Sequence, residues 1–202
     1  MSDGSTDLPL FPLATVLVPG GRMPLRIFER RYLDLVRDCL RSGDPFGVVW
    51  IRRGSEVARQ GLPGPELGAH GTTARIVDWD QLPDGLLGIT IEGVARFDLE
   101  GTTVRPGGLL VGRVNPRPAL RLQPMQTTWR SLREVLEGLA THPHVARLGM
   151  RPDLDDAWQV AFALVQLLPL EESLKYELLG LEDLPALMAN LERTLNRMAD
   201  GG

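Results

Sequence analysis

His142 and His144 are the residues whose spacing most resembles that of metal ligands. They stand on either side of Pro143, so both imidazoles could reach a single ion. The third histidine is His70 and the single cysteine is Cys39, so a zinc site would lack the further nitrogen or sulfur ligands that it needs. We therefore interpret the two histidines as exposed residues of a turn between helices.

A second candidate metal site is the group of carboxylates at Asp153, Asp155 and Asp156. Calcium loops of the EF-hand type also need a central glycine and a terminal glutamate, and neither follows here at the required spacing. Asp155 and Asp156 precede an apolar run with helical periodicity, where carboxylates commonly cap free amide groups. We therefore expect helix capping at this position, no bound metal and no cofactor.

No pairing of a nucleophile with a base is evident along the chain. Lys175 is the only lysine, and Ser173 lies two residues before it, about 200° around a helix axis, so a local Ser-Lys pair is excluded. A phosphate-binding loop needs a glycine-rich run followed by lysine, which does not occur. The hydrolase motifs Gly-x-Ser-x-Gly and His-Glu-x-x-His are absent as well. The sequence therefore predicts a protein that is not an enzyme.

Charge and hydropathy narrow the kinds of partner that the chain can bind. The formal net charge of -4 does not favour nucleic acid, because neutralising phosphates takes clustered Lys and Arg. No stretch approaches the roughly 20 apolar residues that span a bilayer, and residues 1–7 lack the basic and apolar regions of a secretory signal. We expect a cytoplasmic protein without a membrane-spanning segment, in which Cys39 is a packing residue.

The first half of the chain is predicted to form a β domain. Short apolar runs, many of them alternating, are separated by Gly and Pro, which is typical of antiparallel strands joined by tight turns. Residues 29–41 instead carry apolar side chains every three or four positions, so we expect one helix embedded among the strands. Residues 52–71 are rich in Gly and Pro and are predicted to form a long surface connection. The predicted strands span residues 8–11, 16–18, 25–28, 46–51, 72–79, 86–92, 95–99 and 109–114.

The second half of the chain is predicted to be helical. The proline-rich segment 115–124 can sustain neither a sheet ladder nor a helix interior, so we place a boundary between domains of residues 1–118 and 119–202. Beyond it, apolar residues recur at helical spacing in four segments separated by Pro or Gly. The predicted fold class is α+β: a β-barrel with one embedded helix, followed by a small C-terminal helical bundle.

Eight runs of residues together resemble the amino-terminal, substrate-binding domain of Lon proteases. In one-letter code these are LPLFPL at 8–13, VLVPG at 16–20, MPLRIFERRY at 23–32, FGVV at 46–49, GTTARI at 71–76, EGVARF at 92–97, LLPL at 167–170 and KYELL at 175–179. Each run alone is a weak signal, but their order and spacing cover nearly the whole chain. One departure is Arg30, which stands where the family usually has Pro, in a helical turn where Pro is favourable but not required.

The resemblance implies a PUA-like β-barrel followed by a helical subdomain, in agreement with the residue patterns. Lon proteases continue into an ATPase module and a Ser-Lys protease module, for which the 202 residues carry no motif. We therefore expect a stand-alone, non-catalytic binding module of protein quality control. Its partner is expected to be unfolded or tagged polypeptide, or a protein on which it docks, and it could also form a homo-oligomer.

Two other functions stay open on the sequence alone. A PUA-like barrel could bind RNA, which would require a patch of arginines on one face. A pocket between the two subdomains could serve a small-molecule sensor or enzyme, which would require convergent titratable groups.

Partner-binding residues are predicted within the Lon-like runs. The candidates are Arg22, Met23, Arg26, Glu29, Arg31, Tyr32, Phe46 and Arg96. Charges in such apolar segments are costly unless they are paired, so we expect Glu29 to form an ion pair with Arg96 or Arg75. The binding face is expected to include residues 20–23, the connection 52–71 and the seam against the helical half, because loops and seams concentrate ligand contacts.

Aromatic side chains could supply the apolar anchors of a groove for extended peptide. We expect most of them to lie in the core and only a few to contact a partner. The aromatic residues considered are Trp50, Trp79, Trp129, Trp158, Phe11, Phe28, Phe46 and Tyr32.

Overall fold

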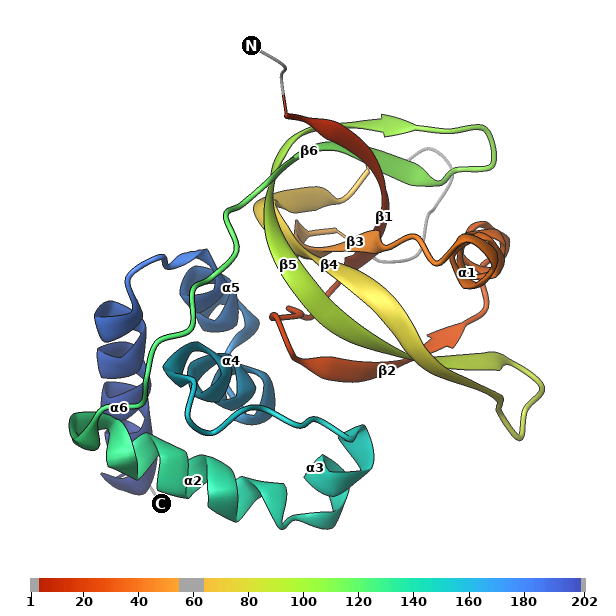
Figure 1. Cartoon of the computed structure of the whole chain (residues 1–202). Helices are drawn as coiled ribbons and strands as arrows, with labels where there is room; N and C mark the ends of the chain where they lie inside the picture. The colour runs from red at the N-terminus through yellow and green to blue at the C-terminus, as the bar shows by residue number, and fades with distance from the viewer. Residues whose placement is uncertain (1–3, 55–63, 201–202) are drawn as a thin grey trace. The chain divides into compact units, whose positions relative to one another are not determined.

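The computed structural model describes residues 4–54 and 64–200 (Figure 1). The chain divides into two compact units, Met1–Ala119 and Leu120–Gly202. All described strands lie in the first unit together with one helix, and the second unit holds the remaining described helices. The predicted α+β class, with one helix among the strands and helices after them, is confirmed.

Six strands form one mixed sheet in the first unit (Figure 1). They are β1 (Thr6–Leu13), β2 (Arg22–Ile27), β3 (Phe46–Arg53), β4 (Glu66–Gln81), β5 (Leu87–Val104) and β6 (Leu110–Pro116). Their order is β2-β5-β4-β3-β1-β6, with an additional pairing of β5 with β6. β1 and β3 run parallel, and the other neighbours are antiparallel. The expected barrel is therefore a single curled sheet in which β2, which pairs only with β5 among the described strands, remains an edge strand.

The helix α1 (Arg30–Ser42) is embedded among these strands, as predicted. It begins after Glu29, whose backbone is extended, and ends at Gly43, whose φ of 78° is readily adopted only by glycine. Tyr32 on its buried face stacks on Phe11 of β1, with ring centroids 3.9 Å apart. Aromatic packing therefore fixes the helix on the sheet.

The strand predictions are wrong at two places. The sequence predicts separate strands at residues 86–92 and 95–99, but Gly93 between them continues the ladder, and both segments belong to β5. Residues 16–18 are predicted as a strand, yet they are buried outside the named strands, and next to them Pro19 forms an isolated bridge to Gly93. A buried apolar run therefore has the same sequence pattern whether or not it pairs in a sheet.

Gly93 lies where two segments of backbone approach closely. A Cβ built on it would be 2.2 Å from the carbonyl oxygen of Val18, a distance that no side chain can occupy. Its carbonyl accepts a hydrogen bond from Gly20 N, and its N–H donates to the carbonyl of Gly21, both at 2.9 Å. These bonds hold the segment that precedes β2 against the middle of β5.

The connection predicted at residues 52–71 is only partly a loop. Its first two residues end β3, and its last six begin β4 at Glu66. Residues 55–63 lie outside the described residues. The two strands that the segment joins, β3 and β4, pair antiparallel, with register shifts between Val49 and Arg53.

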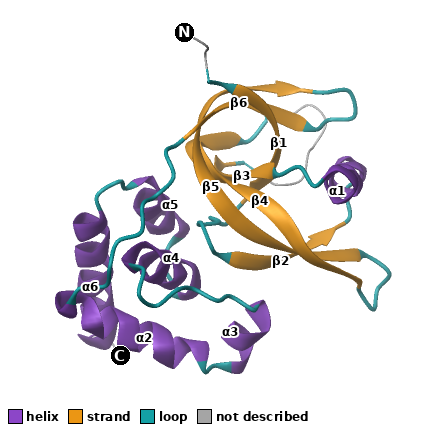
Figure 2. Cartoon of the chain, viewed as in Figure 1, coloured by secondary structure: helices purple, strands orange, loops and turns teal. Residues whose placement is uncertain are grey.

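The second unit is built of helices (Figure 2). They are a short η1 (Thr127–Trp129), α2 (Arg130–Ala140), α3 (Pro143–Leu148), α4 (Ala157–Leu167), α5 (Glu172–Gly180) and α6 (Leu184–Asp200). α4 is buried along most of its length, and α2, α5 and α6 pack against it. The turn predicted at residues 142–144 is instead the start of α3, because Pro143 occupies the first helical position, where its missing N–H costs nothing.

Among the described residues, no helix combines the length and the apolar character needed to cross a bilayer.

Candidate functional site

A surface hollow of about 540 Å³ lies at one end of the sheet in the first unit, beside the edge strand β2. Three segments form it: the middle of β2, the end of β4 with the turn that follows, and the beginning of β5. Its lining residues are Pro24, Leu25, Arg26, Asp78, Trp79, Asp80, Leu82, Pro83, Asp84, Gly88, Ile89 and Thr90. Most of them are apolar or glycine, so the hollow offers an apolar floor with a few polar groups at its margin.

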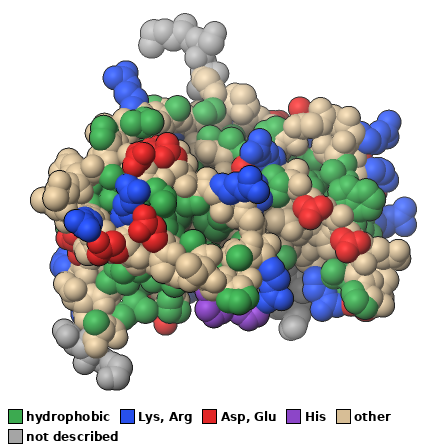
Figure 3. All heavy atoms as spheres, turned by 60° about the horizontal axis from the view of Figure 1, so that its bottom comes forward, with side chains coloured by type: hydrophobic (Ala, Val, Ile, Leu, Met, Phe, Trp, Pro, Cys, Tyr) green, Lys and Arg blue, Asp and Glu red, His purple; other side chains and the backbone are tan. Residues whose placement is uncertain are grey.

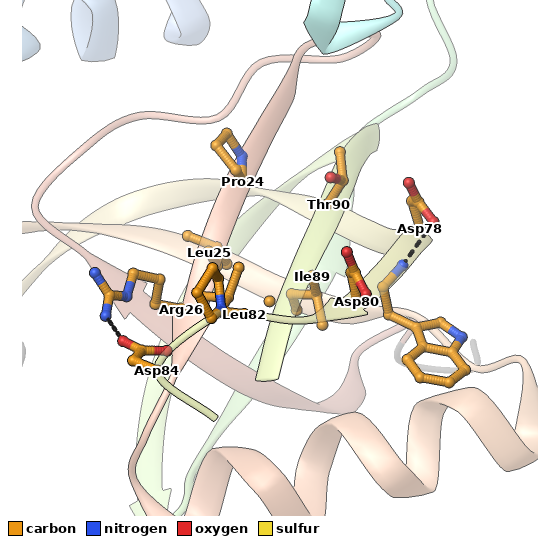
Figure 4. Close-up of a pocket in the computed structure, with 12 residues that line it drawn as sticks. Pro24, Leu25, Arg26, Asp78, Asp80, Leu82, Asp84, Ile89 and Thr90 are labelled. Atoms are coloured by element: carbon orange, nitrogen blue, oxygen red, sulfur yellow. Dashed lines mark hydrogen bonds and ion pairs between the residues drawn. The ribbon is translucent and has the colours of Figure 1, made fainter. Parts of the chain in front are cut away.

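The register of three strands places several of the lining side chains on one face of the sheet. Pro24 of β2 lies opposite Thr90 of β5, which lies opposite Asp78 of β4. Because opposite residues on paired strands point to the same side of a sheet, these three side chains form a row. Figure 4 shows them projecting in the same direction.

Gly88 lies in the next row, between Arg26 and Asp80. It has no side chain, and a Cβ there would be 2.9 Å from the Cδ2 of Leu82, so the leucine of the turn lies over it. The turn itself is closed by a 2.8 Å hydrogen bond from Leu82 N to the carbonyl of Leu86. An apolar side chain of a ligand could therefore rest beside Leu82 above the backbone of β5.

Carboxylates surround this apolar floor. Asp84 forms an ion pair with Arg26 across the turn (Figure 4). One oxygen of Asp78 accepts a hydrogen bond from Trp79 N at 2.9 Å, and one oxygen of Asp80 accepts from Gln81 N at 2.7 Å. These bonds orient the two side chains but bring no positive charge to them.

Trp79 is the largest apolar side chain that lines the hollow. It is 61% exposed although it lies in a strand, where large aromatic residues are usually packed. Its neighbours Asp78 and Asp80 alternate with it along β4, so the indole projects from the opposite side of the strand. The indole thus extends the apolar surface around the end of β4.

The row next to the hollow is a charged cluster rather than a binding floor. Glu92 of β5 pairs with Arg22 of β2 at 2.6 Å and with Arg75 of β4 at 2.5 Å. Partial burial raises the pKa of the Glu92 carboxyl, but hydrogen bonds and charge from Arg75 and Arg22 outweigh burial and leave this pKa below its ordinary value. The cluster ties three strands together at the border of the hollow.

Figure 3 shows the surface of one face of the molecule, where acidic and basic side chains lie close together with hydrophobic side chains exposed between them. Some exposed residues form ion pairs, for example Arg130 with Glu134 at 2.8 Å. Isolated exposed pairs of this kind contribute little to stability.

Four of the predicted partner-binding residues are buried. Met23, Tyr32 and Phe46 belong to the apolar core, with exposed fractions of 7%, 5% and 0%. Arg96 is 6% exposed, and its carbonyl accepts a hydrogen bond from Arg117 N. The structure gives these residues packing contacts, and a contact with a partner stays a prediction for them.

The other four predicted residues are charged groups with partners inside the first unit. Glu29 pairs with Arg31 at 2.9 Å, so the predicted pairing with Arg96 or Arg75 named the wrong arginine. Arg31 also donates to the carbonyl of Gly108 at 3.0 Å and lies over the ring of Tyr32. Arg22 belongs to the charged cluster described above, and Arg26 is the member of the predicted set that lines the hollow.

The aromatic residues divide as the sequence predicts, with most in the core. Phe11, Phe46, Tyr32, Trp129 and Trp158 are buried. Trp79 and Phe28 are 61% and 58% exposed, and Trp79 lines the hollow.

Sequence reasoning missed the turn residues of the hollow, Leu82, Pro83 and Asp84. A signal was available, because a tryptophan between two aspartates just before a Pro-Asp-Gly turn places an aromatic residue in exposed surroundings. The pairing of this hairpin with β2, which completes the hollow, could not be read from that pattern.

Asp156 of the second unit caps a helix as the sequence suggests, whereas His142 and His144 are exposed but lie at the start of α3 and not in a turn. Asp156 caps α4 by accepting a hydrogen bond from Trp158 N at 3.2 Å. His142 accepts one from His144 N at 3.3 Å, and the two imidazoles stack with centroids 5.4 Å apart. Within the described residues, no group of three or more His, Cys, Asp or Glu is arranged to hold a metal ion.

The sequence profile of the ATP-dependent protease La (LON) substrate-binding domain matches residues 7–197. The chain belongs to this family. The match covers both units, and it confirms the resemblance found in the sequence. It supports a substrate-binding role in proteolysis.

Two curated relatives are Lon proteases. Lon protease 2 of Myxococcus xanthus is 35% identical over 92 residues, which are 45% of this chain and 11% of that protein. The Lon protease of Anaeromyxobacter dehalogenans is 34% identical over 92 residues, 45% of this chain and 10% of that protein. The aligned part of the chain thus spans about a tenth of the length of these relatives.

Two solved structures share the fold over almost the whole chain. The Lon N-terminal domain protein from Xanthomonas campestris has a TM-score of 0.72 and 37% identity, covering 93% of this chain and 98% of that one. The N-terminal domain of the Mycobacterium avium complex Lon protease has a TM-score of 0.60 and 16% identity, covering 92% and 96%. The second likeness concerns the fold alone.

Proposed function

We propose that the chain recognises unfolded or tagged polypeptide through the hollow beside β2 and acts by binding, without making or breaking bonds. The observation that carries the proposal is an apolar, partly open hollow in a chain of the Lon substrate-binding family. Segments of unfolded polypeptide differ from folded surfaces in exposing apolar side chains, and a hollow of this kind can take up one such side chain.

The lining supports a polypeptide ligand better than RNA. Three of the lining side chains are aspartates and one is an arginine. A phosphate backbone would be repelled by this balance of charge, whereas an apolar side chain could pack against the side chain of Leu82, which lies over Gly88. RNA binding is therefore not proposed for this surface.

The test is to fill the hollow. Gly88→Val places a β-branched side chain, which suits a strand, on the floor of the hollow, and the flexible Leu82 side chain can move aside for it. Gly101→Val is the matched control, because Gly101 lies on the same strand and nothing lies within 4 Å of a Cβ built on it. The probe is fluorescein-labelled lysozyme that has been reduced and carboxyamidomethylated, and its anisotropy is measured as the chain is added.

We expect the wild-type chain and Gly101→Val to bind the unfolded probe alike, and Gly88→Val to bind about tenfold more weakly, as for loss of one apolar anchor. Circular dichroism checks that both variants are folded. Equal affinities for the two variants, or no binding by the wild-type chain, would refute the proposal.

A further inference from the structure

The lining of the hollow has an excess of negative charge. Arg26 and Asp84 form an ion pair and offset each other. Asp78 and Asp80 form no ion pair within the described part of the chain, and their hydrogen bonds come from uncharged backbone amides. Two carboxylates therefore face the margin of an apolar floor without a compensating cation.

The arginines of the adjoining row do not supply that cation. Arg22 and Arg75 lie in the adjoining row, but both point to Glu92, at 2.6 and 2.5 Å. Their charge is thus directed away from Asp78, which lies three residues beyond Arg75 along β4. The charge at the margin of the hollow is left to be matched by a ligand.

The edge of β2 does not favour recognition through the backbone. Pro24, in the middle of this edge strand, has no N–H to donate to an added strand. A ligand strand added along β2 would therefore lack one backbone hydrogen bond at Pro24, where the hollow opens. Recognition must come mainly from side chains.

We propose that the hollow selects extended polypeptide segments in which an apolar side chain is flanked by lysine or arginine. The apolar side chain rests against Leu82, and the flanking cations lie near the carboxylates of Asp78 and Asp80. This inference rests on the proposed function and specifies its substrate class.

The experiment compares two labelled peptides in the same anisotropy assay. One consists of repeats of Lys-Leu-Lys-Gly-Ser, and in the other Glu replaces every Lys. The wild-type chain is expected to bind the lysine peptide roughly fivefold more tightly, the effect of two exposed ion pairs, and the preference should shrink as salt is raised.

The double variant Asp78→Asn with Asp80→Asn tests which residues are responsible. Asparagine keeps the side-chain oxygen that accepts the backbone hydrogen bond, so only the charge is removed. The matched control is Asp7→Asn with Asp44→Asn, two exposed aspartates that do not line the hollow. The preference should vanish in the first double variant and persist in the second.

The outcomes separate this inference from the proposed function. If the wild-type chain binds both peptides equally, or if the preference survives in the Asp78 and Asp80 variant, the charge selectivity is refuted while polypeptide binding stands. If neither peptide nor unfolded lysozyme binds, both are refuted. Self-association of the chain in sedimentation that Gly88→Val abolishes would make a second copy the occupant and would also overturn the inference.

Discussion

Gly93→Ala tests the close approach between β5 and the segment that precedes β2. The added methyl group would lie 2.2 Å from the carbonyl oxygen of Val18 and 2.9 Å from its carbonyl carbon, both backbone atoms that cannot rotate away. The segment must therefore move and lose the two 2.9 Å hydrogen bonds that join Gly93 to Gly20 and Gly21.

The cost follows from these contacts. Loss of two hydrogen bonds at about 1 kcal/mol each, added to at least about 1 kcal/mol for overpacking, gives a destabilisation of about 3 kcal/mol. For a unit of this size that corresponds to a fall in melting temperature of about 10 °C. Scanning calorimetry measures it directly.

Gly101→Ala is the control on the same strand. Nothing lies within 4 Å of a Cβ built there, so its effect on the unfolding free energy should stay within about 0.5 kcal/mol. If Gly93→Ala were as mild as Gly101→Ala, the close approach between β5 and the segment before β2 would be wrong.

Three further predictions concern single side chains. Glu92→Gln should lower stability at pH 7 by about 1 kcal/mol, because it weakens the hydrogen bonds to Arg22 and Arg75. The pKa of Glu92 is below its ordinary 4.5 in the folded chain, so in urea unfolding the difference from wild type should disappear as pH falls through that lowered pKa, and a constant difference would contradict the assignment. Burial, with the charges of Asp44 and Asp38, raises the pKa of the Cys39 thiol to about 11, so its reaction with a disulfide reagent at pH 8 should be on the order of a hundred times slower than that of a free thiol. Rapid reaction of Cys39 in the folded chain would refute this prediction. Unfolding the chain in urea should raise the reaction rate to that of a free thiol. Asp156→Ala should cost about 2 kcal/mol in urea unfolding, because Asp156 caps α4 and also accepts a hydrogen bond from Gln123 N, whereas Asp156→Asn should cost less than half as much. Equal effects of the two substitutions would show that the cap is not the cause.

Much of the fold could be predicted because local signals and tertiary contacts agree. α1 was expected at residues 29–41 and is Arg30–Ser42, since its apolar stripe and Gly43 define both its face and its end. α5 ends at Gly180, in line with the expectation that Pro or Gly separates the helical segments. The apolar run at residues 16–18 fits either a paired strand or a buried segment without strand pairing. In the structure it is buried and lies outside the named strands, a difference that the local sequence pattern does not encode.

The site was less predictable than the fold. Arg26 was named from the Lon-like runs, but its neighbours in the hollow come from the turn after β4 and from Gly88 of β5. These segments meet only because the register sets Arg26 opposite Gly88 and Gly88 opposite Asp80, and register depends on long-range pairing that no local pattern encodes. Phe46 is buried and Phe28 is exposed, although both are phenylalanines within Lon-like runs. Residue type and local sequence therefore did not distinguish a core residue from a surface residue.

The most direct measurement of where polypeptide binds is hydrogen exchange of the full chain with and without unfolded lysozyme. Binding in the hollow predicts slower exchange of the amides of residues 78–90 when the probe is present, with no change in residues 98–104 at the other end of β5. Protection confined to residues 98–104, or to the second unit, would contradict the account.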